Sequence, residues 1–253
     1  MRLASRWSIF GLGALLLLAG CGKKCDCDGP AHPNRVVALR FAYVVGDDAR
    51  PFHLDSTYST NSDEPVRVAS LKYYLSRVRL IRADSSVWTS PRRAFLLDAG
   101  RCDSLDLHEV PQGTYVGISF DIGLDSATNS RTDWPDYDLA PRHSMYWAWN
   151  TGYKFFSLDG QWFGAAPPAV IEYHIGRAPT LRTVRLPMAA PLVVTASWTP
   201  PVVRVQVRPL TVFGGANVMR LNDSHDRIVQ FDTPQAQRAA DNYATMFRIT
   251  RVE

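Results

Sequence analysis

Apolar and polar residues alternate along much of the chain after residue 35, which is the pattern of strands that bury one face. In the clearest case Val203, Val205 and Val207 alternate with Arg204 and Gln206. Alternation, or a short apolar run between turn residues, predicts further strands over 39–45, 68–82, 94–97, 114–122, 153–158, 170–175, 181–186 and 246–252.

Two of these strands have well-defined apolar faces. The first face consists of Leu39, Phe41, Tyr43 and Val45. The second consists of Thr114, Val116, Ile118, Phe120 and Ile122, opposite Tyr115, Gly117, Ser119 and Asp121. Because successive strand residues point to opposite faces, we expect both apolar faces to point into a core.

Many strands separated by Gly, Pro, Asn and Asp turns favour a mainly β fold, specifically an antiparallel β-sandwich. One helix is predicted near the end of the chain, with Thr233 as its cap, Pro234 at its first position and helix-favouring residues over 236–243. The stretch 121–144 is polar and rich in Asp and Pro, which predicts a long loop. We therefore predict one sandwich domain over 35–253, with long loops and a short C-terminal helix.

The N-terminus has the features of a bacterial export signal. Arg2 and Arg6 precede an apolar run over 9–18, which is shorter than the roughly 20 residues that a membrane-spanning helix needs. The following Leu-Ala-Gly-Cys sequence, ending at Cys21, resembles the lipobox of bacterial lipoproteins. We predict a signal peptide over 1–20, a lipid on Cys21 and a tether over 21–34. Gly22, in place of the Asp typical of inner-membrane retention, favours the outer membrane, with the body in the periplasm or at the cell surface.

Composition narrows the function further. The apolar fraction of 46% is ample for a core, and the net charge of +4 falls to about +2 without Arg2 and Arg6. So weak and evenly spread a charge argues against nucleic-acid binding. No G-x-S-x-G, H-E-x-x-H or P-loop pattern occurs, so the sequence does not predict an enzyme.

Three cysteines remain after Cys21. Cys25 and Cys27 form a C-x-C pair in the tether, where thiolates suit monovalent copper. The alternative is a flexible leader with incidental cysteines, or a disulfide from one of them to Cys102. The sequence favours this alternative, because C-x-C lacks the wider spacing of C-x-x-C metal sites.

The stretch 145–163 is unusually aromatic and includes Trp147 and Trp149. Such density is typical of a core or of a platform that stacks on carbohydrate. His143 precedes the stretch and His174 follows it. His174 falls on a predicted strand, on the face of Glu172, so it is either a ligand or a half-exposed residue.

Two other functions fit parts of the sequence. A glycoside hydrolase needs two carboxylates across one bond, and the acids Asp133, Asp136 and Asp138 lie close together in the predicted loop. These acids also fit calcium binding through their oxygens, or a solvated turn, and the solvated turn is the favoured interpretation. A surface adhesion or carbohydrate-binding module would use the aromatic stretch instead.

Several segments, in this order and spacing, resemble the MbnP-like family of periplasmic copper-binding proteins. They are the segments 70–80 (SLKYYLSRVRL), 110–115 (VPQGTY), 145–155 (MYWAWNTGYKF), 172–176 (EYHIG) and 240–247 (ADNYATMF). The resemblance spans most of residues 36–253. It implies a β-rich domain that binds Cu(I) through histidine nitrogens, aided in some members by a tryptophan oxidised to kynurenine. It also implies a partner, a diheme cytochrome c peroxidase-like protein (MbnH-like), that performs the oxidation.

Carried over to this chain, the resemblance implies His174 as a copper ligand, with His143 close enough in sequence to Trp147 to share the ion. Trp147 and Trp149 match the paired tryptophans of the family, and either is a candidate for oxidation. His53, in the loop after the first strand, is a third candidate ligand. This chain departs from the pattern in two ways: it lacks the histidine that some members carry near the position of Tyr43, and it lacks the extra cysteines of a four-cysteine subgroup.

Overall fold

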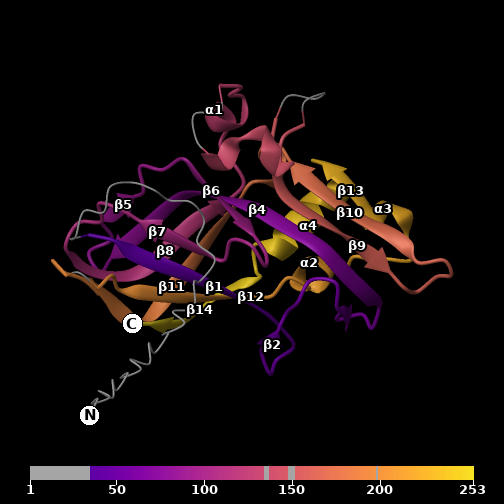
Figure 1. Cartoon of the computed structure of the whole chain (residues 1–253), viewed down its shortest axis with the longest axis horizontal. Helices are drawn as coiled ribbons and strands as arrows, with labels where there is room; N and C mark the ends of the chain where they lie inside the picture. The colour runs from indigo at the N-terminus through magenta and orange to yellow at the C-terminus, as the bar shows by residue number, and fades with distance from the viewer. Residues whose placement is uncertain (1–34, 134–136, 148–151, 198) are drawn as a thin grey trace, which may run out of the picture.

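The protein folds into two packed β-sheets with a few short helices (Figure 1). The computed structural model describes residues 35–133, 137–147, 152–197 and 199–253. About 49% of the chain is strand and 15% is helix, which confirms the predicted β-sandwich. In the described part of the chain, no helix combines the length and the apolar character needed to cross a membrane.

Fourteen strands form the two sheets. They are β1 (Val37–Val45), β2 (Arg50–Pro51), β3 (Thr57–Ser59), β4 (Pro65–Arg82), β5 (Val87–Thr89), β6 (Ala94–Asp98), β7 (Ser104–Leu107), β8 (Gly113–Ile122), β9 (Lys154–Trp162), β10 (Ala169–Gly176), β11 (Arg182–Val194), β12 (Val202–Val207), β13 (Ile228–Phe231) and β14 (Phe247–Val252). The helices are α1 (Ser126–Asn129), α2 (Thr211–Gly214), α3 (Ser224–Arg227) and α4 (Pro234–Tyr243), with 3₁₀ turns η1 (Tyr137–Leu139), η2 (Pro141–His143) and η3 (Ala178–Thr180).

The smaller sheet has the order β14-β12-β1-β2, with β7 also paired to β1. The larger sheet has the order β11-β8-β4-β9-β10-β13, with β3, β5 and β6 also paired to β4. The main apolar core lies between the sheets and includes the predicted inward residues Leu39, Phe41, Val203, Val205 and Val207, all at most 5% exposed. The prediction that these residues point into the core is therefore confirmed.

The long strand β4 runs through the middle of the molecule and joins its two halves (Figure 1). Its first part pairs with β9, and its last part pairs with β8. The partner changes between Tyr73 and Leu75, and a bulge follows between Ser76 and Arg79, where Arg77 has a φ of 46°. A bulge of this kind bends the strand and lets it serve two neighbours.

One predicted face was partly wrong. Ile118, Phe120 and Ile122 of β8 point into the core as expected, but Tyr115 is fully buried while Val116 is only half-buried. The cause is a register shift between β4 and β8 at Ile81–Arg82, because an irregularity of one residue exchanges the two faces beyond it.

Two strand pairs are parallel, within a sandwich predicted as antiparallel. β1 pairs with β12, and β10 pairs with β13, each in parallel. Parallel neighbours need a crossover connection, and here the chain between β10 and β13 contains β11, β12 and two short helices. Alternation within one strand carries no information about the direction of its partner.

The C-terminal helix α4 forms where the sequence predicts it. The Thr233 side chain accepts a hydrogen bond from the Ala236 amide, and Pro234 occupies the first turn. The buried face of α4 adds Ala236, Ala239, Ala240 and Tyr243 to the main core. The Tyr243 ring stacks on Phe156 of β9 with centroids 4.9 Å apart, so α4 covers the inner face of the larger sheet.

The opposite, outer face of the larger sheet is covered at one place by a second apolar cluster. The cluster consists of Tyr74, Ala94, Leu96, Leu124, Leu139, Met145, Tyr153 and Phe155. Leu124 and Leu139 come from the stretch 121–144, which was predicted as a loop and which contains α1, η1 and η2. Beside this cluster, the outer face of β9, β10 and β13 carries polar side chains, and the candidate site lies there.

Candidate functional site

His174 lies on β10 with its side chain on the outer face of the larger sheet, as the sequence predicts. Across the sheet its neighbours are Ser157 on β9 and Gln230 on β13. Ser157 in turn lies opposite Lys72 on β4. One row of polar residues therefore crosses four adjacent strands, and the His174 side chain in it is 19% exposed.

Two carboxylates contact the His174 ring. Its Nε2 is 2.9 Å from Oδ1 of Asp159 on β9, and its Nδ1 is 3.2 Å from Oε1 of Glu172 on β10. Gln230 donates a hydrogen bond from Nε2 to the same Glu172 oxygen. Glu172 was placed on this face from the sequence, whereas Asp159 was missed because it falls one residue past the predicted end of its strand, 153–158.

Two lysines bring positive charge to the same face. Lys72 Nζ lies 3.7 Å from Oδ2 of Asp98 and donates a hydrogen bond to the carbonyl oxygen of His143 at 3.2 Å. Burial lowers the pKa of Lys154, against the opposing influence of Asp159 and Glu172. Charges of both signs thus meet around His174, in a place half shielded from water.

Trp147 packs against the end of β10, at Gly176. A Cβ atom added to Gly176 would come within 2.7 Å of Trp147 Cζ3, so the indole ring covers the Gly176 backbone. Gly176 follows His174 by two residues on β10, and the pairing with β9 shifts register between Ile175 and Gly176. Trp147 is 6% exposed, and its ring lies 5.0 Å from that of Phe231, the last residue of β13.

His143 borders the same face from η2. Its Nε2 contacts the carbonyl oxygen of Tyr137 at 2.9 Å, and its ring packs against the Tyr137 ring. Because a carbonyl oxygen only accepts, Nε2 carries a hydrogen and donates this bond. The hydrogen bond from Lys72 to the His143 carbonyl joins this turn to the row that contains His174.

The structure does not bring the remaining predicted residues to the outer face around His174. His53 is exposed in the loop after β1, where its backbone amide donates to the Tyr58 hydroxyl at 2.8 Å. Trp149 and Cys21 lie outside the described residues. Cys102 is disulfide-bonded. Its partner also lies outside the described residues.

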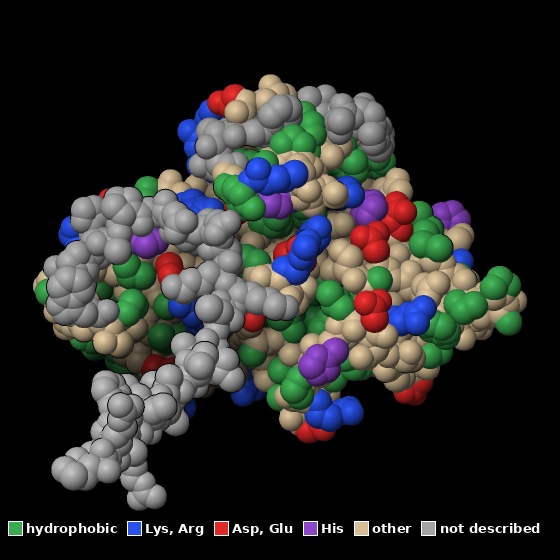
Figure 2. Space-filling view, in the orientation of Figure 1, with side chains coloured by type: hydrophobic (Ala, Val, Ile, Leu, Met, Phe, Trp, Pro, Cys, Tyr) green, Lys and Arg blue, Asp and Glu red, His purple; other side chains and the backbone are tan. Residues whose placement is uncertain are grey.

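Histidines do not gather on this surface. Figure 2 shows their side chains apart from one another, with acidic side chains beside some of them. Within residues 35–133, 137–147, 152–197 and 199–253, no group of three or more His, Cys, Asp or Glu side chains is arranged to hold a metal ion.

Position 43 does not face His174. The Tyr43 hydroxyl lies 3.0 Å from the Tyr73 hydroxyl, within the core between the sheets. Burial raises the pKa of Tyr43. Since Tyr73 points to the inner face of the larger sheet and His174 to the outer face, a donor at position 43 would not share an ion with His174.

The aromatic stretch is mostly core. Tyr153, Phe155 and Phe156 are each at most 1% exposed, and Trp162 is 9% exposed. Buried rings cannot stack on a sugar, so these residues do not form a carbohydrate platform.

Asp138, one of the acids considered for hydrolysis, is instead a buried structural group. Its Oδ2 accepts hydrogen bonds from Arg92 at 2.8 Å and from the Leu96 amide at 3.0 Å. These bonds attach η1 to β6. Asp133 pairs with Arg131 at the surface, and Asp136 lies outside the described residues. The described acids therefore do not form a pair facing one bond.

We predict a specific pH dependence from Asp138. Burial raises its pKa above the ordinary 3.8, although Arg92 opposes this shift. The folded state therefore keeps this proton to higher pH than the unfolded state does, so the contribution to stability falls as pH rises through the folded pKa. In urea unfolding, wild type should lose stability relative to Asp138→Asn as pH rises from below 3.8. A difference that is constant with pH would contradict this.

Comparison with known proteins gives one family and one solved structure. The family model described as MbnP matches residues 34–230. The structure described as MbnP from Methylosinus trichosporium superposes with a TM-score of 0.50 at 17% identity, covering 80% of this chain and 86% of that chain. At this identity, the structural likeness concerns the fold alone. No curated protein sequence matches.

Proposed function

The chain belongs to the MbnP family, and from this premise we propose that it is an exported lipoprotein that binds monovalent copper. The proposed donors are a ring nitrogen of His174 and an amine formed by oxidation of Trp147, with His143 as a further nitrogen donor. The proposed partner is a diheme peroxidase-like protein that carries out this oxidation. The chain itself then needs no catalytic residues.

The observation that carries this proposal is the contact of Trp147 with Gly176, two residues after His174 on β10. The indole ring covers Gly176, which is separated from His174 by one residue of β10. Alternate strand residues are separated by about 7 Å, a distance that two side chains leaning toward each other bridge. In the proposed site, a donor on the residue 147 ring and a donor on His174 share one ion.

The chemistry of the donors agrees with monovalent copper. Imidazole binds copper well, and an aromatic amine supplies the nitrogen electron pair that an intact indole lacks. Low coordination by neutral nitrogen donors in an aromatic setting favours the monovalent ion. The lack of a three-residue cluster in the described chain is compatible with such a site, and it argues against a tetrahedral zinc site built from protein side chains alone.

The oxidation of Trp147 balances with peroxide as the oxidant. The partner would reduce two molecules of hydrogen peroxide to water, and the indole C2–C3 bond would open with addition of two oxygen atoms to give N-formylkynurenine. Hydrolysis then releases formate and leaves the free aromatic amine. Because Trp147 is 6% exposed, the partner would draw electrons from it through the intervening protein surface.

The proposed location follows from the N-terminus. Lipid on Cys21 would hold the protein to a membrane, with the outer membrane favoured by Gly22. The tether over 22–34 then places the folded body in the periplasm or at the cell surface.

Mass spectrometry of the native, full-length protein, together with its metal content, tests this proposal. We expect about one copper per chain and the mass shift of kynurenine on the peptide that holds Trp147. Trp162 is the internal control, because it lies on β9 of the same sheet but packs in the main core. Its peptide should be unmodified.

Each other outcome has a defined meaning. Copper without the mass shift would indicate a histidine site that uses intact tryptophan only for packing. If the protein contains no copper and no modified tryptophan, even after Cu(I) is supplied, the proposed function is ruled out.

A further inference from the structure

A row of polar side chains crosses the outer face of the larger sheet on the other side of β4 from His174. Ser119 of β8 pairs with Arg79 of β4 on one side and with Arg185 of β11 on the other. Phe120, the next residue of β8, points into the main core, so Ser119 points to the outer face. β8 and β11 lie on one side of β4, whereas β9 and β10 lie on the other (Figure 1). The row is therefore separate from the proposed copper site.

One carboxylate lies next to this row, and other side chains already satisfy it. Asp121 is fully buried, and its two oxygens accept hydrogen bonds from Arg77 and from Thr183, the latter at 2.7 Å. Arg79 Nη1 comes only within 4.0 Å of Asp121 Oδ1, which is too far for a hydrogen bond. This contact shows that the Arg79 guanidinium leans over β8. Asp121 therefore offsets the charge of Arg77 and leaves most of the charge of Arg79 uncompensated.

The donors of the row have no protein acceptor. Within the described part of the chain, the side chains of Arg79, Ser119 and Arg185 make no hydrogen bond. Arg185 is exposed, but Ser119 is only 3% exposed, and a buried hydroxyl without a partner favours a ligand that supplies one. Guanidinium groups are the side chains best suited to hold phosphate or carboxylate oxygens. The row therefore has the charge and the donors of an anion site.

We propose that Arg79, Ser119 and Arg185 bind a phosphate group, as free inorganic phosphate or as a phosphate monoester. Neighbouring strands are about 4.8 Å apart, so the two arginines leave their strands about 10 Å apart with the serine between them. A phosphate carries a charge of about −1.5 to −2 at pH 7, which matches two guanidiniums. Its tetrahedral oxygens can accept from donors on three strands at once, whereas a planar carboxylate has only two oxygens. The proposal goes beyond the proposed copper function and does not depend on it.

Calorimetric titration of the full-length protein with inorganic phosphate tests this proposal. We expect a dissociation constant on the order of 1 mM, because a few charged hydrogen bonds on an open face hold the ion. Arg185→Gln and Arg79→Gln should each raise the constant about tenfold or more, and Ser119→Ala about threefold. Arg185 is exposed and has no partner among the described residues, so Arg185→Gln should keep the unfolding temperature of wild type.

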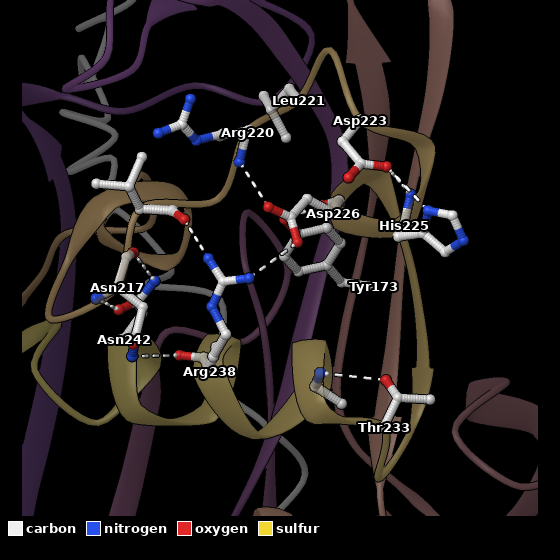
Figure 3. A network of polar contacts seen from close by, with 12 residues as sticks. Tyr173, Asn217, Arg220, Leu221, Asp223, His225, Asp226, Thr233, Arg238 and Asn242 are labelled. Carbon is white, nitrogen blue, oxygen red and sulfur yellow. Dashed lines mark hydrogen bonds and ion pairs between the residues drawn. The ribbon is translucent and has the colours of Figure 1, made fainter.

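Arg220→Gln is the matched control, because it removes the same charge from another exposed arginine. The Arg220 guanidinium makes no hydrogen bond within the described chain (Figure 3). Arg220 lies shortly before α3, which contacts β10 and β13 at the other end of the larger sheet. Its phosphate affinity should equal that of wild type. Equal losses in Arg185→Gln and Arg220→Gln would show a response to net charge alone and would overturn the site, as would an Arg185→Gln affinity equal to that of wild type.

Two further probes identify the ligand class. Glycerol 3-phosphate is the soluble counterpart of a lipid phosphomonoester headgroup. Binding as tight as that of inorganic phosphate would support a site for monoesters, whereas binding of inorganic phosphate alone would support a site for the free ion. Acetate should bind at least about tenfold more weakly, because it has fewer oxygens and less charge. Acetate that binds as tightly as phosphate would overturn the phosphate assignment.

Discussion

Replacing Asn242 by Ala is expected to lower the free energy of unfolding by about 3 kcal/mol, since each buried polar group left without a partner costs about 1–3 kcal/mol. Asn242 lies on α4 and is fully buried. Its Nδ2 donates to the carbonyl oxygens of Val212 at 2.9 Å and Asn217 at 2.7 Å, and its Oδ1 accepts from the Asn217 amide at 2.7 Å.

These bonds attach the chain before β13 to the C-terminal helix. Figure 3 shows Asn242 and Asn217 facing each other, beside Arg238 of the same helix. Arg238 in turn pairs with the buried Asp226, whose backbone carbonyl accepts from Tyr173 of β10. Loss of Asn242 therefore weakens the support behind the strand that carries His174, although it touches no residue of the site.

Asn222→Ala is the matched control for this prediction. Asn222 is an exposed asparagine in the same connecting segment, and its removal should change stability by less than about 0.5 kcal/mol. Urea unfolding at neutral pH measures both. A loss below about 1 kcal/mol for Asn242→Ala would mean that water replaces its hydrogen bonds and that the interior is looser than the structure indicates.

The fold was predictable wherever one strand or helix carries its own signal. Val203, Val205 and Val207 show their buried face without any knowledge of neighbours, and Thr233 with Pro234 marks the start of α4. The segment 240–247 belongs to the family resemblance, and the structure supplies a physical reason for its composition. Asn242 and Tyr243 in it are both buried, and both bond to backbone carbonyls outside the helix.

The fold was not predictable where it depends on pairing. The burial of Tyr115 in place of Val116 follows from a register shift against β4, which is a property of two strands together. The same holds for the parallel pairs of β1 with β12 and of β10 with β13. Short helices within 124–144 were missed because four-residue and 3₁₀ helices carry too few turns for periodicity to appear.

Some features of the candidate site were likewise predictable from the sequence, and others were not. The face of His174 and Glu172 follows from alternation along β10. The contact with Asp159 depends on the register of β9, and the contact of Trp147 with Gly176 depends on how the stretch before β9 folds back over the sheet. Neither has a signal in the sequence. Copper binding by His143 and by His53 stays a prediction.

Replacing His174 by Ala is expected to weaken Cu(I) binding by more than about 100-fold, because even partners that only support a metal ligand are worth about 10–100-fold. Trp147 covers the backbone of Gly176, and His174 is the histidine nearest to Gly176 in the chain. Loss of the His174 side chain removes a ring-nitrogen donor that its neighbours do not replace. Asp159 and Glu172 would remain, but their oxygens suit hard cations better than monovalent copper. Competition with a Cu(I) chelator measures the change.

Alanine at the other candidates ranks their contributions against this loss. His225→Ala is the matched control, because His225 is also paired with a carboxylate but is exposed on α3, and it should leave affinity unchanged. His143→Ala should weaken binding less than His174→Ala, since its ring is held against Tyr137 at the border of the face, and His53→Ala less still. Equal affinity of His174→Ala and wild type would show that copper binds elsewhere. A loss confined to His174 and His143 would instead mean that the outer face of β10, and not the interior around Tyr43, is where this chain holds the ion.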